Sequence, residues 1–412
     1  RSPMVLQWPS LLAFCGGAAD VEGCSGKCES RCSLDAWHWA ERHSSCSSSP
    51  WCGLEGGGEW PSPADMPVPH WDTLEPITQE ELAESIERVS NAVRQWEPEN
   101  YSLVRHLQDA LGNHGTVDMM QSNLPDGQFV AVKRMPNRWV TVGHQEFRRR
   151  YPLSPELPWV DLGLLRQLNR LCFPYACDLL GTYCDEDFTY VVMSLARWGD
   201  LLTWCERPPA MGPEREASMR PIVTQLFVAV QWLHELGIAH RDLSPENVLL
   251  TDDGTQMLIK LVDFGMATPS RTCQGEVRGK EAYQAPEMHD GDPYDSFLAD
   301  AFQLGVVLFT MAARQLPWSA TRPGVCRSFG QFCADGNMLH GGLAGSSPAL
   351  LQLLEGLLEL VPVRRLTLGE GVFAQDRRKS VWEVSWLKTA GEILTERWPC
   401  NALAPLEGIS GF

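Results

Sequence analysis

The segment HRDLSPENVLL, residues 240–250, places a carboxylate and an amide five residues apart, directly before an apolar run. Asp242 could steer an incoming hydroxyl group and Asn247 could hold a metal ion, and phosphoryl transfer needs both functions. A surface turn followed by a strand would explain the same pattern without any chemistry. The rest of the sequence must decide between these two interpretations.

Three other segments carry residues suited to the same chemistry. In VAVK, Lys133 ends an apolar run, where a lysine needs an anionic partner unless it reaches solvent from an edge strand. In LVDFGMA, Asp263 follows an apolar run and is suited either to binding Mg2+ through oxygen or to forming a turn. In ALGNHGTV, residues 110–117, Gly112 and Gly115 would let the backbone approach phosphates, although glycine turns are common.

Composition limits the classes of function. The chain has 412 residues, of which 44% are hydrophobic, so it can bury one large core or several smaller ones. Its formal net charge of -18 argues against a general affinity for nucleic acid or an anionic membrane, because both attract clustered Lys and Arg. No apolar run approaches the roughly 18–20 residues that cross a bilayer, so no membrane span is expected.

The first 75 residues are rich in Cys, Ser, Gly and Pro and show no sustained periodicity. We predict a mostly disordered or loosely ordered extension over 1–75. Residues 4–19 loosely resemble a signal peptide, but Trp8 and Pro9 interrupt the apolar stretch and no basic cluster precedes it, so cleavage is not expected.

Fourteen cysteines are present, six of them in the first 52 residues. Cys24, Cys28 and Cys32 are separated by three residues, whereas zinc ligand pairs usually have two-residue gaps. Free thiols are the favoured interpretation, with zinc or disulfides as alternatives. The later cysteines are scattered singly, which indicates a reduced interior and a cytoplasmic protein.

The hydrophobic periodicity predicts strands first and long helices later. Thr78 can cap a helix over 79–95 with Glu81 as the other half of a capping box, and its apolar face is expected to pack on the next domain. Strands are predicted over 101–107, 128–135 and 188–195, and helices over 160–171, 214–236, 297–313 and 348–360. This order indicates a small sheet-rich lobe and a larger helical lobe, with a ligand site in the cleft between them.

The four chemical motifs occur in one order and are followed by GKEAYQAPE at 279–287 and ADAFQLG at 299–305. Over roughly residues 101–388 the sequence resembles the eukaryotic protein kinase family. The resemblance implies an α+β, bilobal fold, with a small β-rich N-lobe over 101–195 and a larger α-helical C-lobe over 196–388. The segment 76–100 would then lead into the domain, and 389–412 would be a C-terminal tail.

The resemblance also implies a role for each matching residue. Lys133 would grip the nucleotide phosphates, Asp242 would accept the proton of the substrate hydroxyl, and Asn247 would hold one of the metal ions. The ATP-binding residues would be Gly112, Gly115, Val117, Ala131, Lys133, Met193, Leu195 and Leu249, and the metal ligands Asn247 and Asp263. Structural or regulatory roles would belong to Asp161, His240, Arg241, Phe264, Gly265, Glu287, Asp300 and Arg365.

Some of these roles concern specific contacts. His240 and Phe264 would stack with Leu165 and Leu179 as a spine between the lobes. Glu287 would pair with Arg365 inside the large lobe. Arg241 often pairs with a phosphorylated activation loop in the family, and the loop here, 263–287, offers Thr268, Ser270 and Thr272 as acceptors.

The position of Asp161 departs from the family pattern. A glutamate usually pairs with the strand lysine, and an aspartate is one methylene shorter, so the helix must lie closer or the pair is looser. Glu156 and Glu146 are alternative partners, although both fall in 136–158, which we interpret as a long loop insertion. The basic run 148–150 in this insertion is expected to be a solvated face, with phosphate binding as the alternative.

Three further departures affect the expected rate of the reaction. Ala110 replaces the first glycine of the flap, Ser244 replaces a lysine that contacts the transferring phosphate, and Lys280 replaces a threonine. These changes are expected to lower the rate or shift substrate choice more than to remove nucleotide binding.

The sequence thus predicts a serine/threonine protein kinase that uses ATP and Mg2+ to phosphorylate protein hydroxyl groups. The alternative is a pseudokinase scaffold that binds nucleotide or partners without efficient catalysis. The expected partner is a protein substrate, with no nucleic acid and no membrane span. The sequence does not determine the substrate, the oligomeric state or what the cysteine-rich extension binds.

Overall fold

The computed structural model describes residues 59–110, 115–125, 127–207, 209–254, 256–335 and 338–396. The chain divides into two compact units, 1–57 and 58–412, and the structural description concerns the second. Gly112, the signal-like segment 4–19 and the N-terminal cysteines lie outside the described residues.

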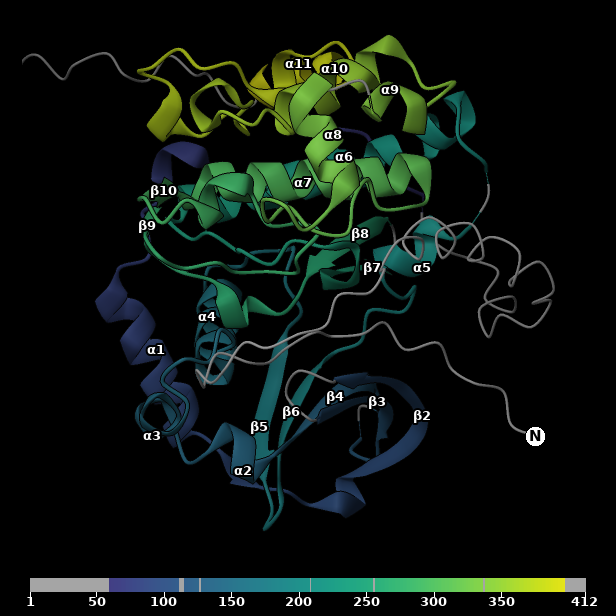
Figure 1. Ribbon diagram of the computed structural model, residues 1–412. Coiled ribbons are helices and arrows are strands. Elements are labelled where there is room, and N and C mark those ends of the chain that lie inside the picture. Colours follow the sequence, from purple (N-terminus) through teal and green to yellow (C-terminus); the bar gives the residue numbers. More distant parts are fainter. Residues whose placement is uncertain are drawn as a thin grey trace, which may run out of the picture. The chain divides into compact units, whose positions relative to one another are not determined.

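The small lobe is built on a six-stranded sheet with strand order β1-β5-β6-β4-β3-β2. Its strands are β1 Arg94–Gln95, β2 Tyr101–Ala110, β3 Gly115–Ser122, β4 Phe129–Pro136, β5 Leu179–Cys184 and β6 Phe188–Ser194. Strands β2 to β6 pair with their neighbours antiparallel, whereas β1 pairs with β5 in parallel. In Figure 1 these strands occupy the lower part of the view, with the helical lobe above them.

Helices dominate the large lobe. Its helices in the described chain are α5 Leu201–Cys205, α6 Pro213–Glu235, α7 Ser296–Ala313, α8 Arg327–Asp335, α9 Met338–Gly342, α10 Pro348–Leu357 and α11 Lys388–Glu396. The helices α1 Gln79–Asn91, α2 Asn137–Val140, α3 His144–Arg150 and α4 Pro158–Arg170 come earlier in the chain, before β5. Short strand pairs accompany them: β7 Val248–Asp252 with β8 Met257–Leu261, and β9 Thr272–Cys273 with β10 Tyr294–Asp295. The sheet-rich lobe followed by a helical lobe confirms the predicted α+β, bilobal fold.

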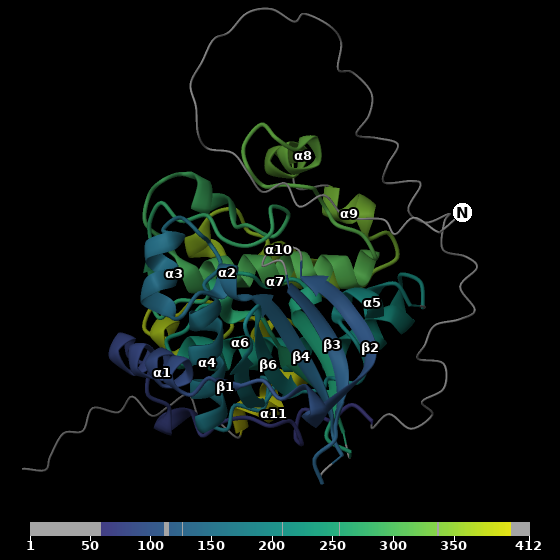
Figure 2. The ribbon, with the colours of Figure 1, turned by 90° about the horizontal axis from the view of Figure 1, so that it is seen from below.

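Helix α7 forms the centre of the large lobe. Among the described residues it is the one helix long and apolar enough to cross a membrane by length and composition, but 94% of it is buried within the protein. It packs against α6 and α10, which are labelled beside it in Figure 2. Its burial identifies this segment as a core helix of the large lobe.

Helix α1 lies directly against α4. Thr78 caps α1, and Glu81 completes the predicted capping box. The Ser85 hydroxyl donates a hydrogen bond of 2.8 Å to the carbonyl of Gly163 in α4. A side chain at Gly163 would meet Ile86 of α1, since an added Cβ would lie 2.4 Å from the Ile86 Cγ1. The expected packing of α1 on the next domain is confirmed, and a glycine makes the close approach feasible.

The structure corrects three boundaries. Helix α1 ends at Asn91 rather than at 95, because Arg94 and Gln95 pair with β5. The predicted loop over 136–158 contains the helices α2 and α3. The tail expected from 389 begins with α11, whose Ala390 and Leu394 are buried, so the large lobe extends past 388.

The predicted loose extension over 1–75 is also wrong for residues 59–75. Met66 is buried, and the Pro67 carbonyl accepts a hydrogen bond of 2.8 Å from the Tyr175 hydroxyl. The Glu59 carbonyl accepts another from the backbone N–H of Met257, 2.9 Å away. A buried residue, Met66, and isolated hydrogen bonds hold this segment against the lobe. Such contacts produce no periodic pattern in the sequence, so periodicity did not predict them.

Gly163→Ala tests the close contact between α1 and α4. We expect a loss of about 1–3 kcal/mol in the free energy of unfolding, because the added methyl group forces α1 away from α4. The measurement is denaturant unfolding, with Gly330→Ala in α8 as the matched control. An added Cβ at Gly330 meets nothing within 4 Å, so that variant should be neutral or slightly stabilised. Equal stability of the two variants would contradict the packing described.

Candidate functional site

One face of the sheet gathers the predicted nucleotide-binding residues. Val117 in β3 lies opposite Lys133 in β4, and Ala131 lies opposite Met193 in β6. Directly opposed residues share a face of a sheet, and so do residues two apart on one strand. Val117, Ala131, Lys133 and Met193 therefore point to the same side.

The connection after β6 brings the large lobe to this face. The N–H of Trp198 donates to the carbonyl of Leu250, and Asp200 forms an isolated bridge with Leu249. Leu249 in β7 thus lies beside the connecting segment that begins at Leu195. Strand β7 of the large lobe is therefore attached to the segment that leaves the sheet at the end of β6.

Lys133 and Asp161 form a buried ion pair. The Lys133 Nζ lies 3.3 Å from the Asp161 Oδ2, and both side chains are largely removed from water. Burial alone would lower the pKa of Lys133, but the carboxylates of Asp161, Asp263 and Glu156 outweigh it and raise this pKa. The lysine is therefore a charged ammonium group at any physiological pH. Of the three expected partners, Asp161 forms the ion pair, Glu156 also acts on the lysine electrostatically, and Glu146 pairs instead with Arg149 on α3.

Asp161 also holds the segment that carries Asp263. Its Oδ1 accepts a hydrogen bond of 3.0 Å from the backbone N–H of Phe264. The carbonyl of Gly265 accepts another from the N–H of Leu157, 2.9 Å away, just before α4. An added Cβ at Gly265 would lie 3.1 Å from Glu156, so a larger residue would separate these segments.

Asp242 is buried in the large lobe and hydrogen-bonded to Asn247. The Asn247 Nδ2 donates both to the Asp242 Oδ2, at 2.9 Å, and to the Asp242 carbonyl, at 2.8 Å. The backbone N–H of Lys280 donates to the Asp242 Oδ1, at 3.2 Å. Burial raises the pKa of Asp242 to about 7, and the charge of Asp263 adds to this effect.

Asp263 connects the two groups. It has a left-handed backbone with a φ of 66°, which an aspartate tolerates better than most residues do. The N–H of the preceding Val262 donates to the Asn247 carbonyl, at 3.1 Å. The Asp263 carboxylate acts electrostatically on both Lys133 and Asp242. Asp263 is therefore electrostatically linked to both Lys133 and Asp242, and Asn247 is hydrogen-bonded to Asp242.

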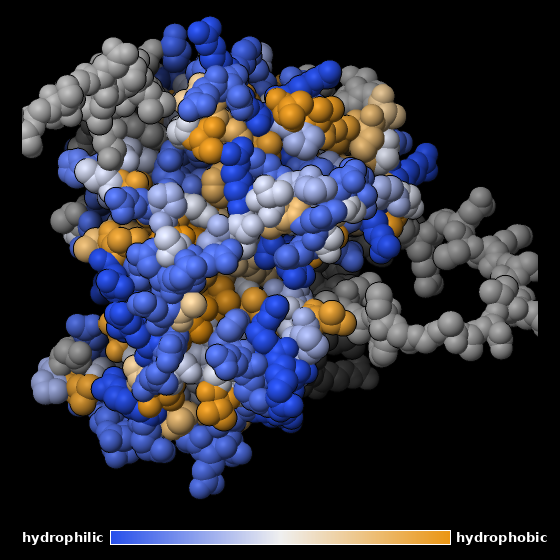
Figure 3. Space-filling model, turned by 90° about the vertical axis from the view of Figure 1, so that its left-hand side faces the viewer, coloured by the Kyte–Doolittle hydropathy of each residue, from blue (hydrophilic) through white to orange (hydrophobic). Residues whose placement is uncertain are grey.

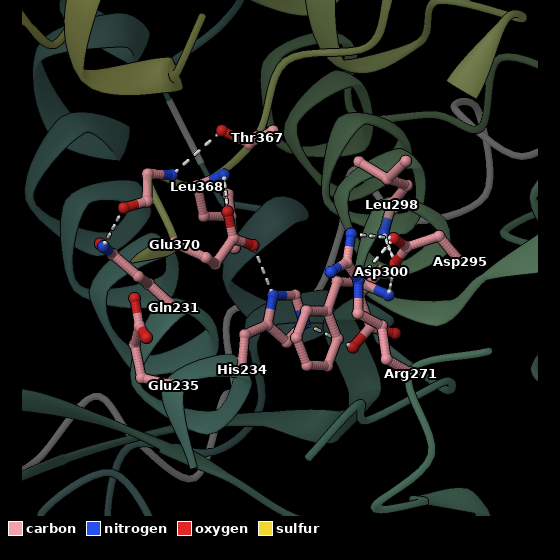
Figure 4. A network of polar contacts seen from close by, with 12 residues as sticks. Gln231, His234, Glu235, Arg271, Asp295, Leu298, Asp300, Thr367, Leu368 and Glu370 are labelled. Atoms are coloured by element: carbon pink, nitrogen blue, oxygen red, sulfur yellow. Dashed lines mark hydrogen bonds and ion pairs between the residues drawn. The ribbon is translucent and has the colours of Figure 1, made fainter. Parts of the chain in front are cut away.

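A buried polar network around His234 and Asp300 (Figure 4) reaches the loop that carries Asp242. Asp300 of α7 accepts hydrogen bonds from the backbone N–H groups of His240, at 2.7 Å, and Arg241, at 2.8 Å. His234 of α6 lies between two carboxylates, 3.0 Å from Asp300 and 2.6 Å from Glu370. Burial alone would lower the pKa of His234, but the two carboxylates raise it to about 9. The histidine is thus a buried cation that compensates two buried acids.

Neighbouring contacts support the same loop. The His240 and Phe264 rings lie 5.1 Å apart, Leu165 belongs to the large hydrophobic core and Leu179 packs against it, while the stacking of all four as a spine stays a prediction. The Gln303 side chain donates to the Arg241 carbonyl and accepts from the N–H of Leu243. The backbone of the loop is therefore held from α7 on both sides of Asp242.

Arg241 has an acidic partner in the activation segment. Its guanidinium lies 2.8 Å from the Glu276 carboxylate, which also contacts Arg278 at 3.3 Å. Burial would raise the pKa of Glu276, but the hydrogen bond from Arg241 and the charges of the neighbouring arginines together outweigh burial and lower this pKa. The expected partner of Arg241 was a phosphorylated Thr268, Ser270 or Thr272. In the structure Glu276 occupies the position beside Arg241. Phosphorylation of the activation loop stays a prediction.

A groove runs beside this contact between α1, α3 and the activation segment, and Arg148 lines it together with Arg241, Glu276 and Arg278. Figure 3 views the molecule from this side and shows small hydrophobic groups separated by hydrophilic side chains. The basic run 148–150 was expected to form a solvated face. Arg149 of this run pairs with Glu146 at the surface, in agreement with that expectation.

The predicted ion pair between Glu287 and Arg365 is present. The two nitrogens of the fully buried Arg365 guanidinium lie 2.5 and 3.0 Å from the Glu287 carboxylate oxygens. Arg365 also donates to the carbonyls of Glu359 and Leu298, so all three guanidinium nitrogens donate hydrogen bonds. The pair anchors the end of the activation segment to the large lobe.

The structure places Val117, Ala131, Lys133 and Met193 on one face of the sheet and joins Lys133 to Asp161, whereas the roles assigned to the site residues stay predictions. Sequence reasoning missed His234, Glu276, Gln303 and Glu370. No local pattern marks Glu276, Gln303 or Glu370, since each acts through a partner distant in sequence. A histidine six residues before His240, on a strongly apolar helix, was the available signal for His234.

The fold and the cleft define a class of protein. Residues 111–378 match the family model of the protein kinase domain. The chain therefore belongs to the protein kinase family.

Several curated proteins are similar to the chain. It is 37% identical over 158 residues to CBL-interacting protein kinase 4 of Oryza sativa subsp. japonica, covering 37% of this chain and 34% of that protein. It is 35% identical over 197 residues to testis-specific serine/threonine-protein kinase 5 of Mus musculus, covering 46% and 50%. It is 34% identical over 279 residues to ribosomal protein S6 kinase alpha-4 of Homo sapiens, covering 61% and 33%. The matches thus span half or less of each relative.

His234→Gln should flatten the dependence of stability on pH. The folded-state pKa of about 9 exceeds the ordinary value of 6.5. Proton binding to His234 therefore stabilises the fold fully below pH 6.5, and this stabilisation is lost as pH rises through 9. The lost contribution is about 3 kcal/mol in the wild type. The measurement is denaturant unfolding from pH 6 to 10, with the exposed His70→Gln as a control for removing an imidazole. A wild type and a His234→Gln variant with parallel profiles would contradict the buried cation.

Glu276→Gln should loosen the activation segment. Removing the charge weakens the contacts to Arg241 and Arg278, so amide hydrogen exchange over 266–280 should become faster. The neighbouring Glu281→Gln, which keeps both contacts, is the matched control. Unchanged exchange in Glu276→Gln would show that the ion pair does not order the segment.

Proposed function

We propose that this chain is a serine/threonine protein kinase that transfers the γ-phosphate of ATP to hydroxyl groups of proteins. The proposal is supported by the electrostatic proximity of the Asp263 carboxylate to both Lys133 and Asp242, together with the hydrogen bond from Asn247 to Asp242. Phosphoryl transfer needs little covalent chemistry from the protein, so such positioned charges are the main requirement. The similar proteins named as serine/threonine kinases support the choice of acceptor.

The adenine ring would lie between Val117 and Ala131 on one side and Leu249 on the other, with Met193 at the back. Lys133, fixed by Asp161, would hold the α- and β-phosphates. Its charge persists because neighbouring carboxylates raise its pKa. The predicted ATP site thus combines an apolar slot with one fixed cation.

Asn247 and Asp263 are suited to hold Mg2+, which prefers oxygen ligands and commonly combines one or two protein groups with substrate phosphates. Within the described residues no group of three or more His, Cys, Asp and Glu is placed to hold a metal ion by itself. Two oxygen donors beside Lys133 fit a metal that arrives with the nucleotide. When bound, Mg2+ would neutralise charge on the phosphates.

Asp242 would orient the acceptor hydroxyl and take its proton. Asn247 and the Lys280 N–H each hold one of its carboxylate oxygens, so its direction is fixed. The anchored Glu287–Arg365 pair and the helix α7 shape the region beside it, which the family uses for peptide substrates. A protein substrate therefore fits better than a small molecule.

The pH dependence of the reaction tests the role of Asp242. Only the carboxylate form accepts a proton, and its pKa in the free protein is about 7. We therefore expect kcat/KM to rise with pH through an acidic limb near pH 7. Asp242→Asn should lower kcat by about 10²–10⁴-fold. Incorporation of labelled phosphate from Mg–ATP into a basic protein, followed from pH 5.5 to 9, is the measurement.

Lys133→Met is a second variant in the same assay. Equal incorporation by the wild type and both variants would indicate a contaminating kinase. No incorporation by any of them, with a retained thermal shift on adding nucleotide, would favour the pseudokinase alternative and overturn the proposal.

A further inference from the structure

Two unusual residues of the site lie in contact with each other. Ser244 occupies the catalytic-loop position at which the family resemblance leads one to expect a lysine, and its side chain is fully buried. Lys280 lies in the activation segment, 36 residues further along the chain. Its Nζ donates a hydrogen bond of 2.7 Å to the Ser244 Oγ. The ammonium group thus reaches the place left by the short serine.

The backbone around Lys280 is held against the catalytic loop. Its N–H donates to the Asp242 Oδ1, at 3.2 Å, and its carbonyl accepts from the N–H of Tyr283, at 2.8 Å. The preceding Gly279 has a φ of 83°, and an added Cβ there would lie 2.7 Å from the Arg241 carbonyl. A glycine is therefore needed for this close approach, which starts the lysine side chain beside Asp242.

The surroundings of the ammonium group suit an incoming anion. The side chain of Lys280 keeps 41% of its exposure, so solvent or a ligand can reach it. It also pairs with Glu246, at 3.1 Å, an exposed contact of the kind that contributes about 0–1 kcal/mol. A phosphate carrying more than one negative charge competes well with such a partner. Lys133, by contrast, is committed to Asp161.

We propose that Lys280 is a catalytic residue that binds the γ-phosphoryl group of ATP, supplying from the activation segment the positive charge that Ser244 lacks. This inference rests on the proposed kinase function. The acceptor oxygen forms a bond to the γ-phosphorus while the bond from that phosphorus to the β–γ bridging oxygen breaks. The electron pair leaves with ADP, and the hydroxyl proton passes to Asp242. Lys280 exchanges no proton and stabilises the charge on the transferring oxygens.

The location of this charge has a consequence for regulation. A lysine on the catalytic loop would stay in place whatever the activation segment does. A lysine at 280 is in place only when the segment lies against the loop through Gly279 and the Lys280 N–H. The cation and the ordered segment are therefore gained or lost together.

A relocation experiment tests the proposal. Lys280→Thr should lower kcat about 10–100-fold with little change in the KM for protein substrate. The double variant Ser244→Lys with Lys280→Thr returns the charge to the catalytic loop and should recover most of kcat. Lys379→Thr, an exposed lysine elsewhere in the large lobe, is the matched control and should leave kcat unchanged.

Nucleotide affinity gives a second readout that does not depend on turnover. A lysine that contacts the γ-phosphate favours Mg–ATP over Mg–ADP, since ADP lacks that group. The ratio of the two Kd values, measured by calorimetry, should therefore fall in Lys280→Thr and recover in the double variant. Lys280→Gln, which can still donate to Ser244, should show the same loss and separates charge from folding.

The outcomes distinguish the two proposals. A wild type without phosphate transfer overturns the kinase function, while the affinity ratio still decides the role of Lys280. An unchanged ratio in Lys280→Thr and Lys280→Gln overturns that role. A rise in substrate KM without loss of kcat, not repaired by Ser244→Lys, shows that Lys280 only shapes the substrate-binding loop.

Discussion

Lys133 and Asp161 form an ion pair removed from water, and the arrangement of the cleft depends on it. The lysine comes from the sheet, whereas the aspartate comes from α4 and also holds the N–H of Phe264. Breaking one side of such a buried pair leaves an uncompensated charge, which typically costs about 3–5 kcal/mol. One interaction therefore ties a strand, a helix and the start of the activation segment to a single geometry.

Helix α4, which carries the short side chain of Asp161, packs closely against two neighbouring segments. On one side, Gly163 lets α1 approach until the Ser85 hydroxyl reaches the α4 backbone. On the other, Gly265 lets the activation segment hydrogen-bond to the residue before the helix. Helix α4, which carries Asp161, is thus held between α1 and the start of the activation segment.

The catalytic loop is held from two directions. From the core, Asp300 fixes its backbone and is itself compensated by the buried cation His234. From the activation segment, Glu276 pairs with Arg241, and Lys280 reaches Ser244. The first set is shielded from water and therefore persistent, whereas the second is partly exposed and follows the segment. The orientation of the Asp242 carboxylate thus depends both on the buried contacts of the core and on the partly exposed contacts of the activation segment.

The sequence by itself determined the order of elements, the capped start of α1 and the residues that line the cleft, because these features depend on local pattern and motif spacing. It left open whether Asp161, Glu156 or Glu146 pairs with Lys133, and it missed the helices of 136–158 and the ordered segment 59–75. Only the tertiary structure decided these points, and it alone revealed the contact of His234 with a glutamate 136 residues away. Contacts between distant residues arise from packing of whole elements, which leaves no periodic trace in the chain.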